Sequence, residues 1–196
     1  AQLAQCLLPL IDADQEAALP DAQAAVDAFA EIYEAERLAR FRDKLGLEEA
    51  RPEDAALVED LLEAMAEGEA DFTLTFRGLR GLPDAGGPET DAAVRALFKR
   101  PEPFDAWARA WRSRLAAEPR PEAERQAAQR AANPAFIPRN HRVEEAIAAA
   151  AASGDLDPFA RLLTAITRPF EDQPERADLM APARPEEAVT RTFCGT

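Results

Sequence analysis

The segment Asn133–His141, which reads Asn-Pro-Ala-Phe-Ile-Pro-Arg-Asn-His, brings together amide, guanidinium and imidazole side chains. Such side chains invite a functional interpretation, but no nucleophile, metal-binding set or phosphate-binding loop accompanies them in the sequence. We therefore expect the segment to be architectural. Asn133, Arg139 and Asn140 are the candidates for its structural or interface contacts.

The same segment is expected to cross between two helices. Pro134 and Pro138 lack a backbone N–H and bias the residues before them toward extended conformations. Phe136 and Ile137 are bulky and apolar, so they should anchor the crossing in a core. Asn140 stands where the N-cap of the next helix is expected.

Other catalytic chemistry finds little support in the sequence. His141 is the only histidine, which excludes multi-histidine metal sites and a relay between two imidazoles. No Walker A or dinucleotide-binding glycine pattern is present. Carboxylate pairs such as Glu59 with Glu63 follow from composition and are interpreted as solvated helix faces. We expect no catalytic, cofactor-binding or metal-binding residue in this chain.

The two cysteines lie at opposite ends of the chain, too few for a disulfide scaffold. Cys194 is third from the C-terminus, so its thiol is expected to be exposed and free to reach another sulfur. Cys6 lies among apolar residues of a helix and is expected to be a buried, inert thiol.

The elements that must position these residues are helices. The 196-residue chain is rich in Ala, Leu, Glu and Arg and poor in β-branched residues, which favours helix over sheet. We expect an all-α fold, an irregular bundle of about eight or nine helices over residues 1–168. Four prolines then punctuate a polar segment over residues 169–196, which should be an extended surface tail with Phe170, Leu179 and Met180 as anchors.

One long helix should be a major packing element. Pro20 can begin it and Gly46 can end it in a left-handed conformation. Its apolar stripe comprises Val26, Phe29, Ile32, Tyr33, Leu38, Phe41 and Leu45. Further helices are expected over residues 52–67, after an Asp71 cap, over 122–132, and after an Asp157 cap.

Trp107 and Trp111 are four residues apart and should lie on one face of another helix. A tryptophan stripe can stack nucleic-acid bases, but at helical spacing beside Leu115 it is typical of a hydrophobic core. We therefore expect both indoles to be buried.

The charge is unevenly distributed. The chain carries a formal charge of −14, yet eleven Lys and Arg face five Asp and Glu between Arg95 and Arg142. That region could dock on an acidic partner surface or on phosphate, but the favoured interpretation is a set of solvated faces and capping partners. Because the net charge of the chain is strongly negative, and no stretch has the length of a membrane span, we expect neither nucleic acid nor a membrane as partner.

The motifs together are similar to the C-terminal part of the selenoprotein O family, also called YdiU, a family of kinase-like proteins. Their specificity comes mainly from the pattern Asn-Pro-aromatic-Ile-x-Arg-Asn followed by Pro-Phe-Glu. The resemblance is carried by Leu57–Leu62 through Ala70–Leu79, by Asn133–His141 with Glu145-Ala-Ile and Gly154-Asp, and by Arg168-Pro-Phe-Glu-Asp-Gln-Pro-Glu.

The resemblance implies that the parent protein transfers AMP from ATP to Ser, Thr or Tyr hydroxyls of other proteins, using a kinase-like (pseudokinase) fold with Mg²⁺ or Mn²⁺. The nucleotide-binding and metal-binding residues of the family lie upstream of the segment matched here. The chain itself would be non-catalytic, and its partners would be the upstream portion and the parent's protein substrates. The compartment would be the cytoplasm for a bacterial protein and the mitochondrion for a eukaryotic one.

The resemblance also implies a role for Cys194. Phe193-Cys-Gly-Thr is similar to the family's terminal motif, whose cysteine or selenocysteine can pair with a cysteine of the kinase-like part. Arg139 is the member of the Asn133–His141 segment to test for contact with that part. The alternative is an autonomous helical protein-interaction module without enzymatic activity.

Overall fold

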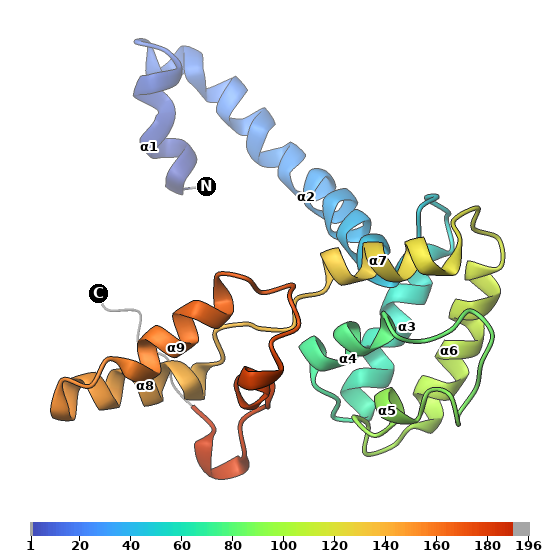
Figure 1. The fold of residues 1–196 in the computed structure, drawn as a ribbon. Helices are drawn as coiled ribbons and strands as arrows, with labels where there is room; N and C mark the ends of the chain where they lie inside the picture. The colour runs from blue at the N-terminus through green and yellow to red at the C-terminus, as the bar shows by residue number, and fades with distance from the viewer. Residues whose placement is uncertain (1, 190–196) are drawn as a thin grey trace.

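The computed structural model describes residues 2–189, and every regular element in that range is helical (Figure 1). The predicted all-α class is therefore confirmed. The α-helices are α1 (Gln2–Ile11), α2 (Gln15–Leu45), α3 (Asp54–Glu67), α4 (Phe72–Leu79), α5 (Ala92–Arg95), α6 (Glu102–Leu115), α7 (Glu122–Ala132), α8 (Asn140–Ser153) and α9 (Asp157–Ile166). Two 3₁₀ helices follow, η1 (Pro174–Met180) and η2 (Pro185–Glu187).

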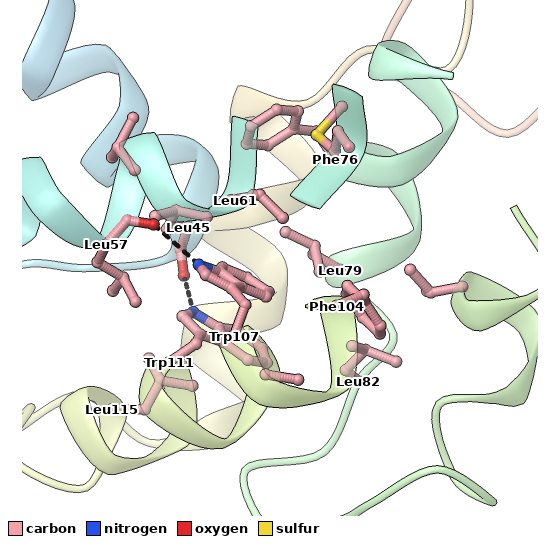
Figure 2. Packing of buried hydrophobic residues seen from close by; sticks show 14 of the residues in the cluster. Leu45, Leu57, Leu61, Phe76, Leu79, Leu82, Phe104, Trp107, Trp111 and Leu115 are labelled. Atoms are coloured by element: carbon pink, nitrogen blue, oxygen red, sulfur yellow. Dashed lines mark hydrogen bonds between the residues drawn. The ribbon is translucent and has the colours of Figure 1, made fainter. Parts of the chain in front are cut away.

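The main hydrophobic core lies where α3 and α6 pack together and where α4, α5, α7 and the C-terminal end of α2 close around them. Figure 2 shows this core with the two tryptophans at its centre. It consists of Leu45, Leu47, Leu57, Val58, Leu61, Met65, Phe76, Leu79, Leu82, Val94, Phe98, Phe104, Trp107, Ala108, Trp111 and Leu115. We call this part of the molecule the body.

Both indoles are buried, as the helical spacing predicts. Trp107 is 4% exposed and Trp111 is fully buried. Each ring also satisfies its N–H: Trp107 Nε1 donates to the Leu57 carbonyl at 2.8 Å and Trp111 Nε1 donates to the Leu45 carbonyl at 3.0 Å (Figure 2). Neither ring is free to stack on a nucleic-acid base.

The long helix α2 differs from the prediction in two respects. It begins at Gln15, not at Pro20, because Asp14 caps it by accepting hydrogen bonds from the Glu16 and Ala17 amides. Only its C-terminal end packs in the body. Its N-terminal half leaves the body with α1 as its neighbour, and the apolar stripe there is exposed (Figure 1). The exposed members are Val26, Phe29, Ile32 and Tyr33.

The C-terminal end of α2 is fixed by a glycine. Gly46 has φ of +76°, a left-handed conformation that glycine adopts at no steric cost. A Cβ at this position would lie 2.6 Å from the Cγ of Arg125, so α7 can approach α2 closely only because the side chain is missing. The predicted helix stop is therefore confirmed.

The α8–α9 hairpin forms a separate unit beside the body (Figure 1). Gly154, with φ of +71°, ends α8, and α9 returns along it. The segment after α9 folds into η1, so it is not the fully extended tail that the prolines predict. Of its predicted anchors, Leu179 is buried, Met180 is half-buried and Phe170 is 43% exposed.

Two predicted N-caps are displaced by one residue. Asn140 is the first residue of α8, and Arg139 occupies the cap position with extended backbone angles and no capping hydrogen bond from its side chain. Asp157 is likewise the first residue of α9, after Leu156. The cap predicted at Asp71 is correct, since its carboxylate accepts the Leu74 amide at 2.8 Å.

Among residues 2–189, none of the helices is both long enough and apolar enough to cross a membrane.

Candidate functional site

The Asn133–His141 segment crosses from α7 to α8, as the two prolines predict. The Ala135 and Phe136 amides both donate to the carbonyl of Pro169, at 2.7 and 3.2 Å. Phe136 is 2% exposed and packs in a small second core with Ala165 and Leu179. The predicted anchor at Phe136 is confirmed, whereas Ile137 is only half-buried.

Asn133 joins this segment to the end of α2. Its side chain is fully buried, and its Nδ2 donates to the Lys44 carbonyl at 2.9 Å. Its Oδ1 accepts from Lys44 Nζ at 3.4 Å, while the same ammonium donates to the Ala132 carbonyl at 3.1 Å. Burial lowers the pKa of Lys44 from its ordinary value. The amide of Asn133 therefore joins the end of α7 to the end of α2 through both the backbone and the side chain of Lys44.

Arg77, on α4, ties the segment to the chain after α9. Its Nη1 donates to the Asn133 carbonyl at 2.8 Å, and its Nη2 donates to the Phe170 carbonyl at 3.1 Å and to Asp172 at 2.7 Å. Asp172 also accepts from Arg80 at 2.8 Å. Burial lowers the pKa of Arg77, and the hydrogen bond from Arg77 holds the pKa of Asp172 below its usual range.

Arg139 and Asp71 form the second ion pair of the site. Arg139 Nη1 lies 2.8 Å from Asp71 Oδ2, and Nη2 lies 3.0 Å from Oδ1, the two-pronged geometry that guanidinium and carboxylate favour. Burial opposes ionisation of Asp71, but hydrogen bonds from Arg139 and the Leu74 amide outweigh it and keep its pKa low. The same carboxylate thus starts α4 and holds the residue before α8.

The two residues after Arg139 have different environments. Asn140 is exposed, and no hydrogen bond of its side chain is present among the described residues. His141 is 9% exposed, with a buried Nε2 that has no partner there. Burial, followed by the positive charge of Arg142, lowers the pKa of His141 below its ordinary value. Of the three candidate residues, the structure joins Asn133 and Arg139 to the body and leaves Asn140 at the surface.

The basic region from Arg95 to Arg142 is mostly not a set of solvated faces, so that prediction is wrong for its central arginines. Arg125 is 2% exposed; its Nε lies 2.7 Å from Asp84, and its Nη2 donates to the Leu82 carbonyl at 2.7 Å. Arg112 pairs with buried Asp91 through two hydrogen bonds of 2.9 and 2.7 Å. These cations neutralise acids of the same molecule, and little of their charge is available to a partner.

Arg114 belongs to the most buried of these networks. The carboxylate of Asp54 is fully buried and accepts from Arg114 Nε at 2.8 Å, from Arg42 Nε at 2.6 Å and from the Arg51 amide at 2.9 Å. Arg114 also pairs with Glu118. Burial opposes ionisation of Asp54, but Arg114 and the Arg51 amide hold its pKa below its ordinary value.

The structure corrects the prediction for Cys6. Cys6 is exposed on α1, not buried, because that face of α1 has no neighbour in the described chain. Cys194 lies outside the described residues. Within residues 2–189 no group of three or more His, Cys, Asp or Glu side chains is placed to hold a metal ion.

Sequence reasoning missed three charged residues of the site. Arg77, Asp71 as an ion-pair partner, and Asp172 hold the segment in place, although only the cap role of Asp71 was expected. A signal was available for Arg77, since it lies between Phe76 and Leu79 in a short apolar helix, where an arginine needs a buried partner. Chemically, the arrangement supplies ion pairs and hydrogen bonds that join α2, α4, α7, α8 and the segment after α9.

Comparison with known proteins places this arrangement in context. A family model described as "Protein adenylyltransferase SelO" matches residues 1–167. The chain is 49% identical over 195 residues to "Protein nucleotidyltransferase YdiU" of Bradyrhizobium sp. (strain ORS 278). It is 51% identical over 195 residues to the protein of that name from Rhodopseudomonas palustris (strain BisB18), and 51% identical over 196 residues to that of strain BisB5. Each alignment covers 100% of this chain and 39% of the relative, so the chain spans about two fifths of the length of these curated relatives.

Proposed function

Because the chain belongs to the SelO protein adenylyltransferase family, we propose that it is the C-terminal helical region of a longer protein nucleotidyltransferase. The parent would transfer AMP from ATP to hydroxyl side chains of other proteins. The observation that carries the proposal is the match to the family along the chain, combined with coverage of only 39% of each relative.

We assign this region a supporting, non-catalytic role. The charged side chains of the candidate site are occupied with one another, as in the Arg139–Asp71 and Arg77–Asp172 pairs. A catalytic group needs access to substrate and a neighbour that tunes its reactivity. Side chains committed to joining helices are instead suited to holding a scaffold rigid. ATP and Mg²⁺ or Mn²⁺ would then bind in a kinase-like portion outside this chain.

The experiment compares incorporation of labelled AMP from ATP by the full-length protein and by residues 1–196 alone. Under the proposal, the full-length protein labels itself or a protein acceptor, and the isolated chain incorporates none. Equal incorporation by the isolated chain would overturn the supporting role. Absence of incorporation by the full-length protein, with acceptor proteins and either metal supplied, would count against adenylylation.

A second candidate function is an autonomous protein-interaction module. It is favoured by the exposed apolar residues of α1 and α2, such as Leu3, Phe29 and Ile32, which are 72%, 65% and 60% exposed. The two functions make different predictions about the reading frame upstream of Ala1. A kinase-like segment encoded there supports the adenylyltransferase, and its absence leaves the module.

For Cys194 we propose a disulfide with a cysteine of the kinase-like portion, on the strength of the terminal Phe-Cys-Gly-Thr motif. Peptide mapping of the full-length protein with and without reductant tests it. The expected result is a cross-linked peptide containing Cys194 that disappears on reduction. Recovery of Cys194 only as a free thiol after oxidation would contradict the proposal.

A further inference from the structure

The α8–α9 hairpin carries an apolar groove of about 390 Å³ whose lining side chains are all apolar. Ala146 and Leu162, which are 5% and 6% exposed, lie in it beside larger side chains that are open to solvent. The exposed members are Ile147, Leu156, Phe159 and Leu163, which are 55%, 60%, 51% and 44% exposed.

The exposed apolar residues of the described chain are not scattered. Apart from Phe72 and Phe170, every large hydrophobic residue exposed within residues 2–189 lies on the α8–α9 hairpin or on α1 and the N-terminal half of α2, which we call the α1–α2 arm. In the view of Figure 1, both units lie on the same side of the body, away from α6. Apolar surface that gathers on one unit, as in the α8–α9 groove, marks an interface, since soluble proteins otherwise keep such patches small.

The geometry points to one occupant: we propose that the α8–α9 groove is filled by an apolar segment of the part of the full-length protein that lies outside this chain. This inference rests on the proposed function, because it requires that longer protein. About three fifths of each curated relative has no counterpart in the chain, so the missing portion is larger than the chain itself.

The α1–α2 arm supports the same occupant. None of the described residues of α1 is buried, and in the N-terminal half of α2 only Ala18 and Ala22 are. Helix α1 has 10 residues, and isolated helices shorter than about 12–15 residues are marginally stable in water unless an apolar face is packed. A large covering portion on this side of the body would supply that packing to the arm and reach the hairpin as well.

Two other occupants fit less well. A second copy of the chain would present the same concave patch across a two-fold axis, and one hollow does not fill another. An anionic lipid surface would need a cluster of basic residues, but residues 140–168 contain three Arg against four Asp and Glu. Packing by an apolar segment of the same protein needs neither feature.

The test is hydroxyl-radical footprinting of the full-length protein, with each side chain's oxidation read by mass spectrometry. Fully buried Phe104 provides the reference for a protected ring. We expect Phe159 to be oxidised as slowly as Phe104, and Ile147 and Leu163 to be protected with it. The protection should persist on dilution and after deletion of residues 190–196.

The other outcomes overturn the proposal. Free oxidation of Phe159 means that the groove is open, and protection lost on dilution means that a second copy fills it. Protection lost on deletion of residues 190–196 means that the chain's own end fills it. AMP incorporation is measured on the same preparation. If the protein incorporates no AMP while the groove is still protected, the result counts against the proposed function and not against this inference.

A pair of variants of the full-length protein gives an independent readout. Phe159→Asn places a polar group in the groove, whereas Thr164→Asn changes an exposed α9 residue outside it. We expect Phe159→Asn to lower the thermal midpoint and to speed oxidation of Ile147 and Leu163, while Thr164→Asn does neither. Equal behaviour of the two variants would overturn the proposal.

Discussion

Arg139 and Asp71, 68 positions apart in the sequence, are joined by two parallel hydrogen bonds of 2.8 and 3.0 Å. Since Asp71 also accepts the Leu74 amide at 2.8 Å, one carboxylate fixes both the start of α4 and the residue that precedes α8. The hairpin that bears the apolar groove is therefore attached to the body through a charged pair as well as through the chain.

Replacing Arg139 should destabilise the protein. The side chain of Arg139 is 9% exposed and that of Asp71 is 18% exposed, so Arg139→Ala leaves a largely buried carboxylate unpaired and should cost about 2–3 kcal/mol in the free energy of unfolding. Arg139→Lys keeps the charge but loses one hydrogen bond, so it should cost less. Urea unfolding measures both.

Arg168→Ala provides the control for this pair. Arg168 and Glu171 form an ion pair whose side chains are both more than half exposed, so removing it should change the free energy of unfolding by less than about 0.5 kcal/mol. If Arg139→Ala and Arg168→Ala shift the unfolding midpoint equally, the Arg139–Asp71 pair does not hold the hairpin.

Asp54 should make the protein sensitive to acid. Its pKa lies below the ordinary value of 3.8 in the folded protein, so the stability that its ionised form contributes is present above that value and is lost as pH falls through the folded pKa. Asp54→Asn should cost about 3–5 kcal/mol near neutral pH, because Arg42 and Arg114 lose their buried partner.

The measurement is urea unfolding of the native protein and Asp54→Asn at a series of pH values from 7 to 3. The variant should lose less further stability below pH 4 than the native protein does, since its amide has no proton to gain. Parallel stability curves for the two proteins would show that Asp54 does not titrate with folding.

The parts of the fold that were predictable from sequence are those decided by local chemistry. The stop at Gly46, the cap at Asp71 and the shared face of Trp107 and Trp111 depend on residues within one or two turns, and all three are confirmed. Periodicity indicates which face of a helix is apolar. It does not indicate whether that face has a neighbour, which is why the N-terminal half of α2 was expected to be packed.

The candidate site was less predictable because its contacts join residues distant in sequence. Asn133 and Arg139 could be singled out by type, but their partners Lys44 and Asp71 lie 89 and 68 positions away. The cap at Asn140 failed for a related reason. The chain is extended at Arg139, which is paired with Asp71, and α8 starts at Asn140, one residue earlier than an Asn140 cap would place it.

Removing the indole N–H of Trp111 should measure how much the buried hydrogen bond to the Leu45 carbonyl contributes to the free energy of unfolding. Trp111→Phe keeps an aromatic ring but leaves the Leu45 carbonyl without its 3.0 Å donor, so it should cost about 2–3 kcal/mol when the smaller ring is included. Phe104→Leu, also fully buried but without a polar atom, separates the packing cost from the hydrogen-bond cost. We compare the free energy of unfolding lost in each variant. If the two losses differ only as the change in side-chain volume predicts, the indole N–H of Trp111 has no role in stability.

His141 should titrate below the ordinary histidine pKa of 6.5, because burial and then Arg142 disfavour its charged form. The unfolded chain then binds more protons than the folded one between the folded pKa and 6.5, so stability should rise as pH rises through that window.

His141 is the only histidine, which lets proton NMR follow its ring without assignment ambiguity. Arg142→Gln should move the pKa upward by removing a nearby positive charge, although Glu187 and Glu145 favour protonation in both proteins. A folded pKa at or above 6.5 would contradict the lowering by burial and Arg142 together. A pKa that Arg142→Gln leaves unchanged would show that Arg142 does not act on this imidazole.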